Sequence, residues 1–109
     1  MVPELGKYAI WTSLQELNLC SNNINDKGAE ALSQNSTWTN LLTLDLSLNE
    51  IGDHGAAELS KNTAWTKFQT LDLSSNKIKE KGAEELGKNS TWTNLQTLDL
   101  SDNILPGAI

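Results

Sequence analysis

Apolar and polar positions follow one pattern that returns every 27 residues, so that Leu14 is followed by Leu41, Phe68 and Leu95. Each unit places four apolar side chains and one asparagine at fixed spacing. Self-similarity at a period of this length is typical of a solenoid of stacked units. The recurring positions are Leu14, Leu17, Leu19, Asn22 and Ile24, then Leu41, Leu44, Leu46, Asn49 and Ile51, then Phe68, Leu71, Leu73, Asn76 and Ile78, and finally Leu95, Leu98, Leu100, Asn103 and Leu105.

Three more columns keep the same period, and no insertion shifts them. A leucine, a tryptophan and a glycine recur in register, which makes coincidence a poor explanation for the repeat. The columns are Leu5, Leu32, Leu59 and Leu86; Trp11, Trp38, Trp65 and Trp92; and Gly28, Gly55 and Gly82.

The apolar residues alternate with polar ones near Leu17 and Leu19, and this period of two predicts a strand. We expect short strands near 16–20, 43–47, 70–74 and 97–101. Leu17 and Leu19 then point to one face of the sheet, while Glu16, Asn18 and Cys20 point to the other.

Helix signals follow each strand, from Asp26 to Asn35 in the first repeat. An acid stands where exposed N–H groups favour it, and Ala29 with Leu32 forms an apolar stripe at helical spacing. The acids are Asp26, Asp53 and Glu80. The helix should end at an asparagine in the left-handed conformation, which that residue tolerates. These asparagines are Asn35, Asn62 and Asn89.

Strands joined by helices give a parallel sheet with right-handed connections. We therefore expect an α/β fold, a right-handed solenoid with a short parallel sheet on its concave side and helices on its convex side. The chain should form one domain, 1–109, with a partial repeat at 1–13, repeats at 14–40, 41–67 and 68–94, and a partial repeat at 95–109.

Packing accounts for most of the recurring residues. The tryptophans fit a core column better than a ligand cage, because each stands three residues before a strand leucine. The amide of the recurring asparagine can satisfy backbone groups of its own turn and of the adjacent repeat. The glycines allow a helix to approach a neighbouring backbone closely.

The segment from Leu41 to Ile51, which contains Leu44, Leu46 and Asn49, closely resembles the leucine-rich repeat family. The resemblance covers roughly residues 2 to 105. The helical stretch from Gly55 to Leu59 resembles the ribonuclease-inhibitor-like subclass. The resemblance implies a horseshoe segment whose concave strands bind protein.

The formal charge of −6 and the absence of arginine argue against nucleic-acid binding, since phosphate contacts need basic side chains. No apolar run is long enough to span a membrane. Cys20 is the single cysteine, so no intrachain disulfide can form. With no visible secretion signal, this favours the cytoplasm.

The candidate partner-binding residues are those expected to point outward from the strands and the turns after them. They are Glu16, Asn18, Thr43, Asp45, Ser47, Leu48, Thr70, Asp72, Ser74, Thr97, Asp99 and Ser101. Asp45, Asp72 and Asp99 should form a column about 4.8 Å apart. A solvated acidic face explains this column better than a cation site, because calcium needs 6–8 converging oxygens.

The sequence contains no phosphate loop, no metal-ligand spacing and no nucleophile constellation, so we expect no catalytic residue, cofactor or metal. Two segments that match the glycosylation pattern begin at Asn35 and Asn89, where a structural cap is the better explanation. His54 fits an exposed helix residue, and Cys20 an incidental thiol.

Neither end of the pattern has a polar cap of the kind that solenoids need for solubility. The chain begins at a helix position, Leu5, and Pro106-Gly107 stops the pattern. Leu95, Leu98 and Leu100 should therefore form an apolar edge without a helix above it, which predicts self-association through an end.

The sequence favours a protein-interaction module, a segment of a larger receptor, effector or scaffold, with a protein as its partner. Two alternatives stay open. One is a self-assembling structural repeat, and the other is a GTPase regulator of the Ran-activator type, which the missing arginine weakens.

Overall fold

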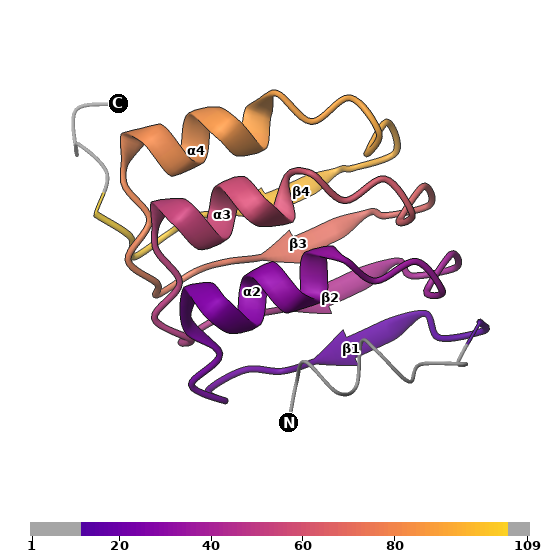
Figure 1. Ribbon diagram of the computed structural model, residues 1–109, viewed down its shortest axis with the longest axis horizontal. Coiled ribbons are helices and arrows are strands. Elements are labelled where there is room, and N and C mark those ends of the chain that lie inside the picture. Colours follow the sequence, from indigo (N-terminus) through magenta and orange to yellow (C-terminus); the bar gives the residue numbers. More distant parts are fainter. Residues whose placement is uncertain (1–11, 105–109) are drawn as a thin grey trace.

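The protein is seen here in a computed structural model that describes residues 12–104. Four strands and three helices alternate along this part of the chain (Figure 1). The strands are β1 (Glu16–Asn18), β2 (Thr43–Asp45), β3 (Thr70–Asp72) and β4 (Thr97–Asp99). The helices are α2 (Asn25–Ser33), α3 (Asp53–Leu59) and α4 (Glu80–Gly87).

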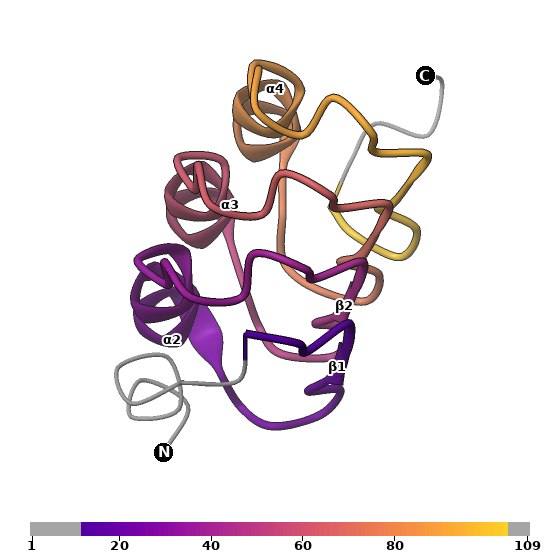
Figure 2. The same ribbon diagram turned by 90° about the vertical axis from the view of Figure 1, so that its right-hand side faces the viewer.

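The molecule is an α/β solenoid of two layers, with the strands in one layer and the helices in the other (Figure 2). The four strands form one parallel sheet in the order of the sequence. Pairing joins residues that differ by one repeat, so that Leu44 lies between Leu17 and Leu71. The solvent-facing side of this sheet is called the concave face below.

The strands lie where the alternation predicted them, but each has only three residues. In the first repeat, the N–H of Cys20 donates to the side-chain oxygen of Asn18 (2.9 Å) and so leaves the ladder. Ser21 then adopts a left-handed backbone, with a φ of 58°. Because the equivalent residues repeat this turn, the regular strand ends early in every repeat.

The helices also lie in the predicted segments, but their ends differ from the prediction. Asn35, Asn62 and Asn89 are not left-handed. The residues that directly follow the helices are right-handed, and they are Gln34, Ser60 and Lys88. Each asparagine acts through its side chain. The Asn62 oxygen accepts the backbone N–H of Trp65 (3.0 Å), and its amide donates to the carbonyl of Asn35 (3.0 Å) in the repeat before.

An acid from one repeat caps the helix of the next. The Asp26 carboxylate accepts the N–H groups of Gly52 (2.7 Å) and Gly55 (3.0 Å) at the start of α3. Neither α3 nor α4 has a cap from its own N-cap side chain. The acid therefore satisfies exposed backbone donors in its neighbour and connects the two repeats.

The core lies between the two layers, and its tryptophans form the predicted column. Trp38 and Trp65 are fully buried, and their ring centroids are 6.5 Å apart. Trp92 continues the stack at 6.3 Å from Trp65. Burial of this kind confirms core packing over a ligand cage.

Residues 1–11 and 105–109 lie outside the described part of the chain. The predictions for Leu5, Trp11, Leu105 and Pro106-Gly107 fall there. Within residues 12–104, no helix combines the length and the apolar character that crossing a membrane requires.

Candidate functional site

The candidate residues lie together on the concave face, because the strand register aligns each with its equivalents. The helices cover the opposite face of the sheet (Figure 2). Glu16, Asn18, Leu48, Thr97 and Ser101 are exposed. The half-buried members of the set are Thr43, Asp45, Thr70, Asp72, Ser74 and Asp99.

Ser47 differs from the rest of the set because only 8% of it is exposed. Its hydroxyl donates to Asp45 Oδ1 at 2.7 Å, and its backbone N–H donates to the same oxygen at 2.9 Å. These contacts give Ser47 a structural role in the turn, and they leave little of its side chain for a partner.

The aspartate column carries the same arrangement in three repeats. Asp72 Oδ1 accepts two hydrogen bonds from Ser74, and Asp99 Oδ1 accepts two from Ser101. Among the described residues, the second carboxylate oxygen of each aspartate has no hydrogen-bond partner. One oxygen therefore holds the turn while the other faces solvent on the concave face.

The hydroxyl and the backbone N–H of Ser101 lower the pKa of the Asp99 carboxyl below its ordinary value of 3.8. Both hydrogen bonds stabilise the charged form of the carboxylate. Asp99 accordingly keeps its negative charge at neutral pH. Residues 12–104 contain no group of three or more His, Cys, Asp or Glu side chains that could hold a metal ion.

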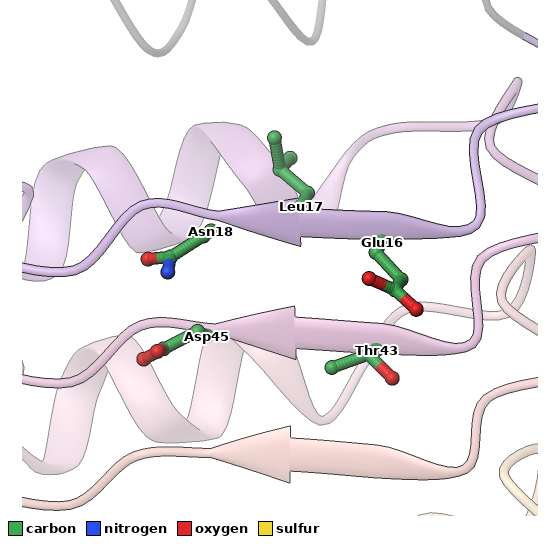
Figure 3. Close-up of a pocket in the computed structure, with 5 residues that line it drawn as sticks. All are labelled: Glu16, Leu17, Asn18, Thr43 and Asp45. Carbon is green, nitrogen blue, oxygen red and sulfur yellow. The ribbon is translucent and has the colours of Figure 1, made fainter.

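A shallow hollow of about 300 Å³ lies between β1 and β2 (Figure 3). It is lined by Glu16, Leu17, Asn18, Thr43 and Asp45. Glu16 extends from β1 towards β2, while Asn18 and Asp45 lie side by side at the other end of the strands. A carboxylate stands at each end of this hollow.

Sequence reasoning included four of the five lining residues as partner-binding positions but did not find the hollow. The available signal was Glu16, which replaces the threonine found at 43, 70 and 97. The inter-repeat cap by Asp26 was also missed. Its signal was the regular offset of Asp26 and Asp53 from Gly55 and Gly82 in the next repeat.

The isolated candidates have structural roles or no described partner. Asn35 is buried and Asn89 is half-buried, and the Asn89 amide donates to the Ser60 carbonyl at 2.6 Å. That geometry supports the structural cap over the glycosylation site. His54 is exposed on α3, as predicted, and Cys20 is a free, half-buried thiol whose sulfur lies 3.5 Å from the Ser21 hydroxyl.

Residues 12–33, 39–60 and 66–87 match the family described as Leucine Rich repeat, and residues 94–109 match a second family of the same description. The chain belongs to the leucine-rich repeat family. The matched segments begin 27 residues apart, at 12, 39 and 66, which is the period of the sequence pattern.

Two solved structures share the fold of this leucine-rich repeat chain. One is leiomodin-1 actin-binding site 2, with a TM-score of 0.70 and 22% identity, over 98% of this chain and 65% of that one. The other is the tropomodulin C-terminal domain of Caenorhabditis elegans, with a TM-score of 0.72 and 15% identity, over 94% of this chain and 63% of that one. This chain thus spans less than two thirds of the length of either. No curated protein matches the sequence.

Proposed function

We propose that this leucine-rich repeat chain is a protein-interaction module that binds its partner on the concave face. The observation that carries the proposal is the aligned row of outward side chains, with no described helix above it. Thr43, Thr70 and Thr97 lie side by side along one row, and the aspartates lie along the next. Such a surface offers hydrogen-bonding groups at strand spacing across a broad area.

The chemistry of this face suits binding better than catalysis. Its recurring groups are hydroxyls and carboxylates, and Asp45, Asp72 and Asp99 each hold a turn with one oxygen. The serine hydroxyls that contact these carboxylates do so within their own turns, where the same oxygen also accepts the serine backbone N–H. We therefore propose no reaction for the chain.

The finer parts of the proposal concern context and partner. We infer that the chain is a segment of a larger receptor, effector or scaffold of the ribonuclease-inhibitor-like subclass. The name of the leiomodin-1 structure connects this fold with actin binding. Purified actin is accordingly the first partner to test for this chain.

The test compares two variants with the same change in charge. Thr70→Arg with Thr97→Arg places two cations on the concave face, and no described hydrogen bond of either side chain is lost. Glu84→Arg makes an equal change on α4, where Glu84 is exposed. Each protein is immobilised and exposed to purified actin and to a cell lysate, and circular dichroism checks that it is folded.

We expect the original chain and the Glu84→Arg variant to retain the same proteins, and the concave-face variant to lose them. Identical retention by all three proteins would contradict binding on this face. Recovery of copies of the chain alone would favour the alternative of a self-assembling repeat. That alternative has one supporting observation, which is that Leu98 on β4 and its neighbours Leu95 and Leu100 are only half-buried.

A further inference from the structure

The concave face contains a cluster of departures from the repeat in its first two strands. Leu42 stands where the other repeats carry glutamine at 15, 69 and 96. Leu48 stands where they carry serine at 21 and 75 and aspartate at 102. Glu16 and Asn18 replace the threonine and aspartate of the later strands. Glu16 and Asn18 line the hollow between β1 and β2, and Leu42 and Leu48 lie before and after β2 in the chain.

The fold itself does not require these side chains. The turn that contains Leu48 forms in the same left-handed conformation with Ser21, Ser75 and Asp102. Leucine is a poor choice there, because a bulky side chain is strained at positive φ and small polar residues are tolerated better. With 56% of its surface exposed, Leu48 also contributes little to the core.

One exposed leucine is ordinary on a protein surface. Here, however, the half-buried Leu42 directly precedes β2, and the exposed Leu48 stands in the turn that follows it. Leu48 follows Leu42 by six positions, so the two residues are at most about 20 Å apart. The hollow between β1 and β2 has the carboxylates of Glu16 and Asp45 in its lining.

The charges of the hollow are available to a partner. Glu16 is exposed and has no ion pair among the described residues. One oxygen of Asp45 accepts two hydrogen bonds from Ser47, and the other oxygen has no hydrogen-bond partner in residues 12–104. The aliphatic stem of a lysine or arginine would lie against Thr43, which also lines the hollow, while its charged head reaches the carboxylates.

We propose that this surface, formed by Glu16, Leu42, Thr43, Asp45 and Leu48, binds an extended protein segment that carries a lysine or arginine between apolar side chains. The inference rests on the proposed function and specifies the chemistry of the partner. The cation enters the hollow between β1 and β2, and the apolar side chains cover Leu42 and Leu48. The departures from the repeat thereby give the part of the concave face around β1 and β2 its specificity for such a segment.

The probe is a nine-residue peptide in which leucine alternates with serine around a central arginine, since alternate residues of an extended chain share a face. A second peptide carries glutamate in place of the arginine. The test variant returns three positions to the residues of the other repeats, as Leu42→Gln, Leu48→Ser and Glu16→Thr. The matched control is His54→Lys, which makes the same kind of return on the convex side.

We expect fluorescence anisotropy to show binding of the arginine peptide to the original chain and to the His54→Lys variant. The triple variant should bind at least about tenfold more weakly, as loss of an anchoring contact does, and should melt at the same temperature or higher. The glutamate peptide should also bind about tenfold more weakly, because it meets the carboxylates with a like charge.

Three results would overturn the inference: no binding of the arginine peptide at millimolar concentration, equal affinity of the triple variant, or equal affinity for the glutamate peptide. The proposed function has its own test at Thr70 and Thr97, which lie outside this surface. The two tests can give different answers. If the Thr70 and Thr97 substitutions abolish partner binding but the arginine peptide does not bind, the concave face would still be the binding face, and only the proposed surface around β1 and β2 would be wrong.

Discussion

Among single residues, the buried asparagines that bridge adjacent repeats make the densest set of contacts. Asn49 is fully buried and accepts the backbone N–H groups of Asn22 (2.8 Å) and Ile24 (3.1 Å). Its amide donates to the carbonyls of Leu19 (2.9 Å) and Ser47 (3.0 Å). One side chain thus satisfies backbone groups of two successive turns, as the sequence predicted.

We predict that Asn49→Ala lowers the free energy of unfolding by about 3 kcal/mol or more, because it leaves several buried backbone groups without a hydrogen-bond partner. Asn22→Ala is the matched control at the same repeat position. Asn22 is exposed, and its amide donates only to the Cys20 carbonyl among the described residues, so its loss should cost less than about 1 kcal/mol. Urea unfolding measures the stability of both variants, and equal midpoints would contradict the role of Asn49 as a bridge between repeats.

The Asp99 carboxyl gives a prediction about pH. Its folded pKa lies below 3.8, so the stability that it contributes is present above pH 3.8 and is lost as the pH falls through the lower folded value. Ser101→Ala removes the hydroxyl donor and should raise the pKa of Asp99 towards 3.8. Carbon-detected NMR titration reads this value. Ser101→Thr keeps the hydroxyl and should leave it near the original, whereas an unmoved pKa in the alanine variant would exclude the hydroxyl as its cause.

At the scale of whole elements, each boundary between helices depends on a glycine facing an acid. A Cβ at Gly55 would lie 2.6 Å from Asp26 Oδ1 and 3.1 Å from Asp26 Cα. The same carboxylate caps α3, so it cannot move away without losing its two hydrogen bonds. Gly82 and Asp53 repeat this contact at α4.

We predict opposite effects for two glycine substitutions. Gly55→Ala should destabilise the protein by about 1–3 kcal/mol, because overpacking forces the backbone of one repeat away from the next. Gly87→Ala, at the end of α4, meets nothing within 4 Å and should stabilise it by up to about 1 kcal/mol. Thermal unfolding followed by circular dichroism shows whether each substitution raises or lowers the melting temperature. Equal effects at the two positions would show that contact with Asp26 does not set the cost at Gly55.

The sequence predicted what depends on period and polarity, namely strands, helices, the tryptophan column and the asparagine bridges. It did not predict contacts that are set by distances between repeats. Asp26 appeared to serve its own helix, and only the packing of α2 against α3 shows that it caps Gly52 and Gly55. The left-handed end assigned to Asn62 was wrong because its side chain, and not its backbone, forms the cap.

The candidate site, like the fold, was predictable where it depends on the period of the sequence. The strand register, and with it the alignment of Thr43 with Thr70, follows directly from the period. The hollow does not, because its shape depends on how the Glu16 side chain extends from β1 towards β2. The division of the chain into repeats at 14, 41, 68 and 95 stays a proposal.

For the whole molecule, burial of one repeat position changes along the solenoid. Leu44 and Leu71 are fully buried, because each has a strand on both sides. Leu98, on β4, has a described strand on one side only and is half-buried. Each repeat in such an array gains stability from its neighbours, so equal sequence does not mean equal contribution.

We therefore predict a graded series of leucine truncations. Leu71→Ala should cost about 3–4 kcal/mol, as for a leucine in a closed core, and Leu98→Ala about half of that or less. Urea unfolding at low micromolar protein concentration measures both values. Equal costs there would mean that the side of β4 away from β3 is covered within one molecule. A cost for Leu98→Ala that rises with protein concentration would instead show a second copy covering Leu98, because association contributes to apparent stability by mass action. The costs of the two truncations thus distinguish a solenoid that binds partners on its concave face alone from one that also assembles through its end.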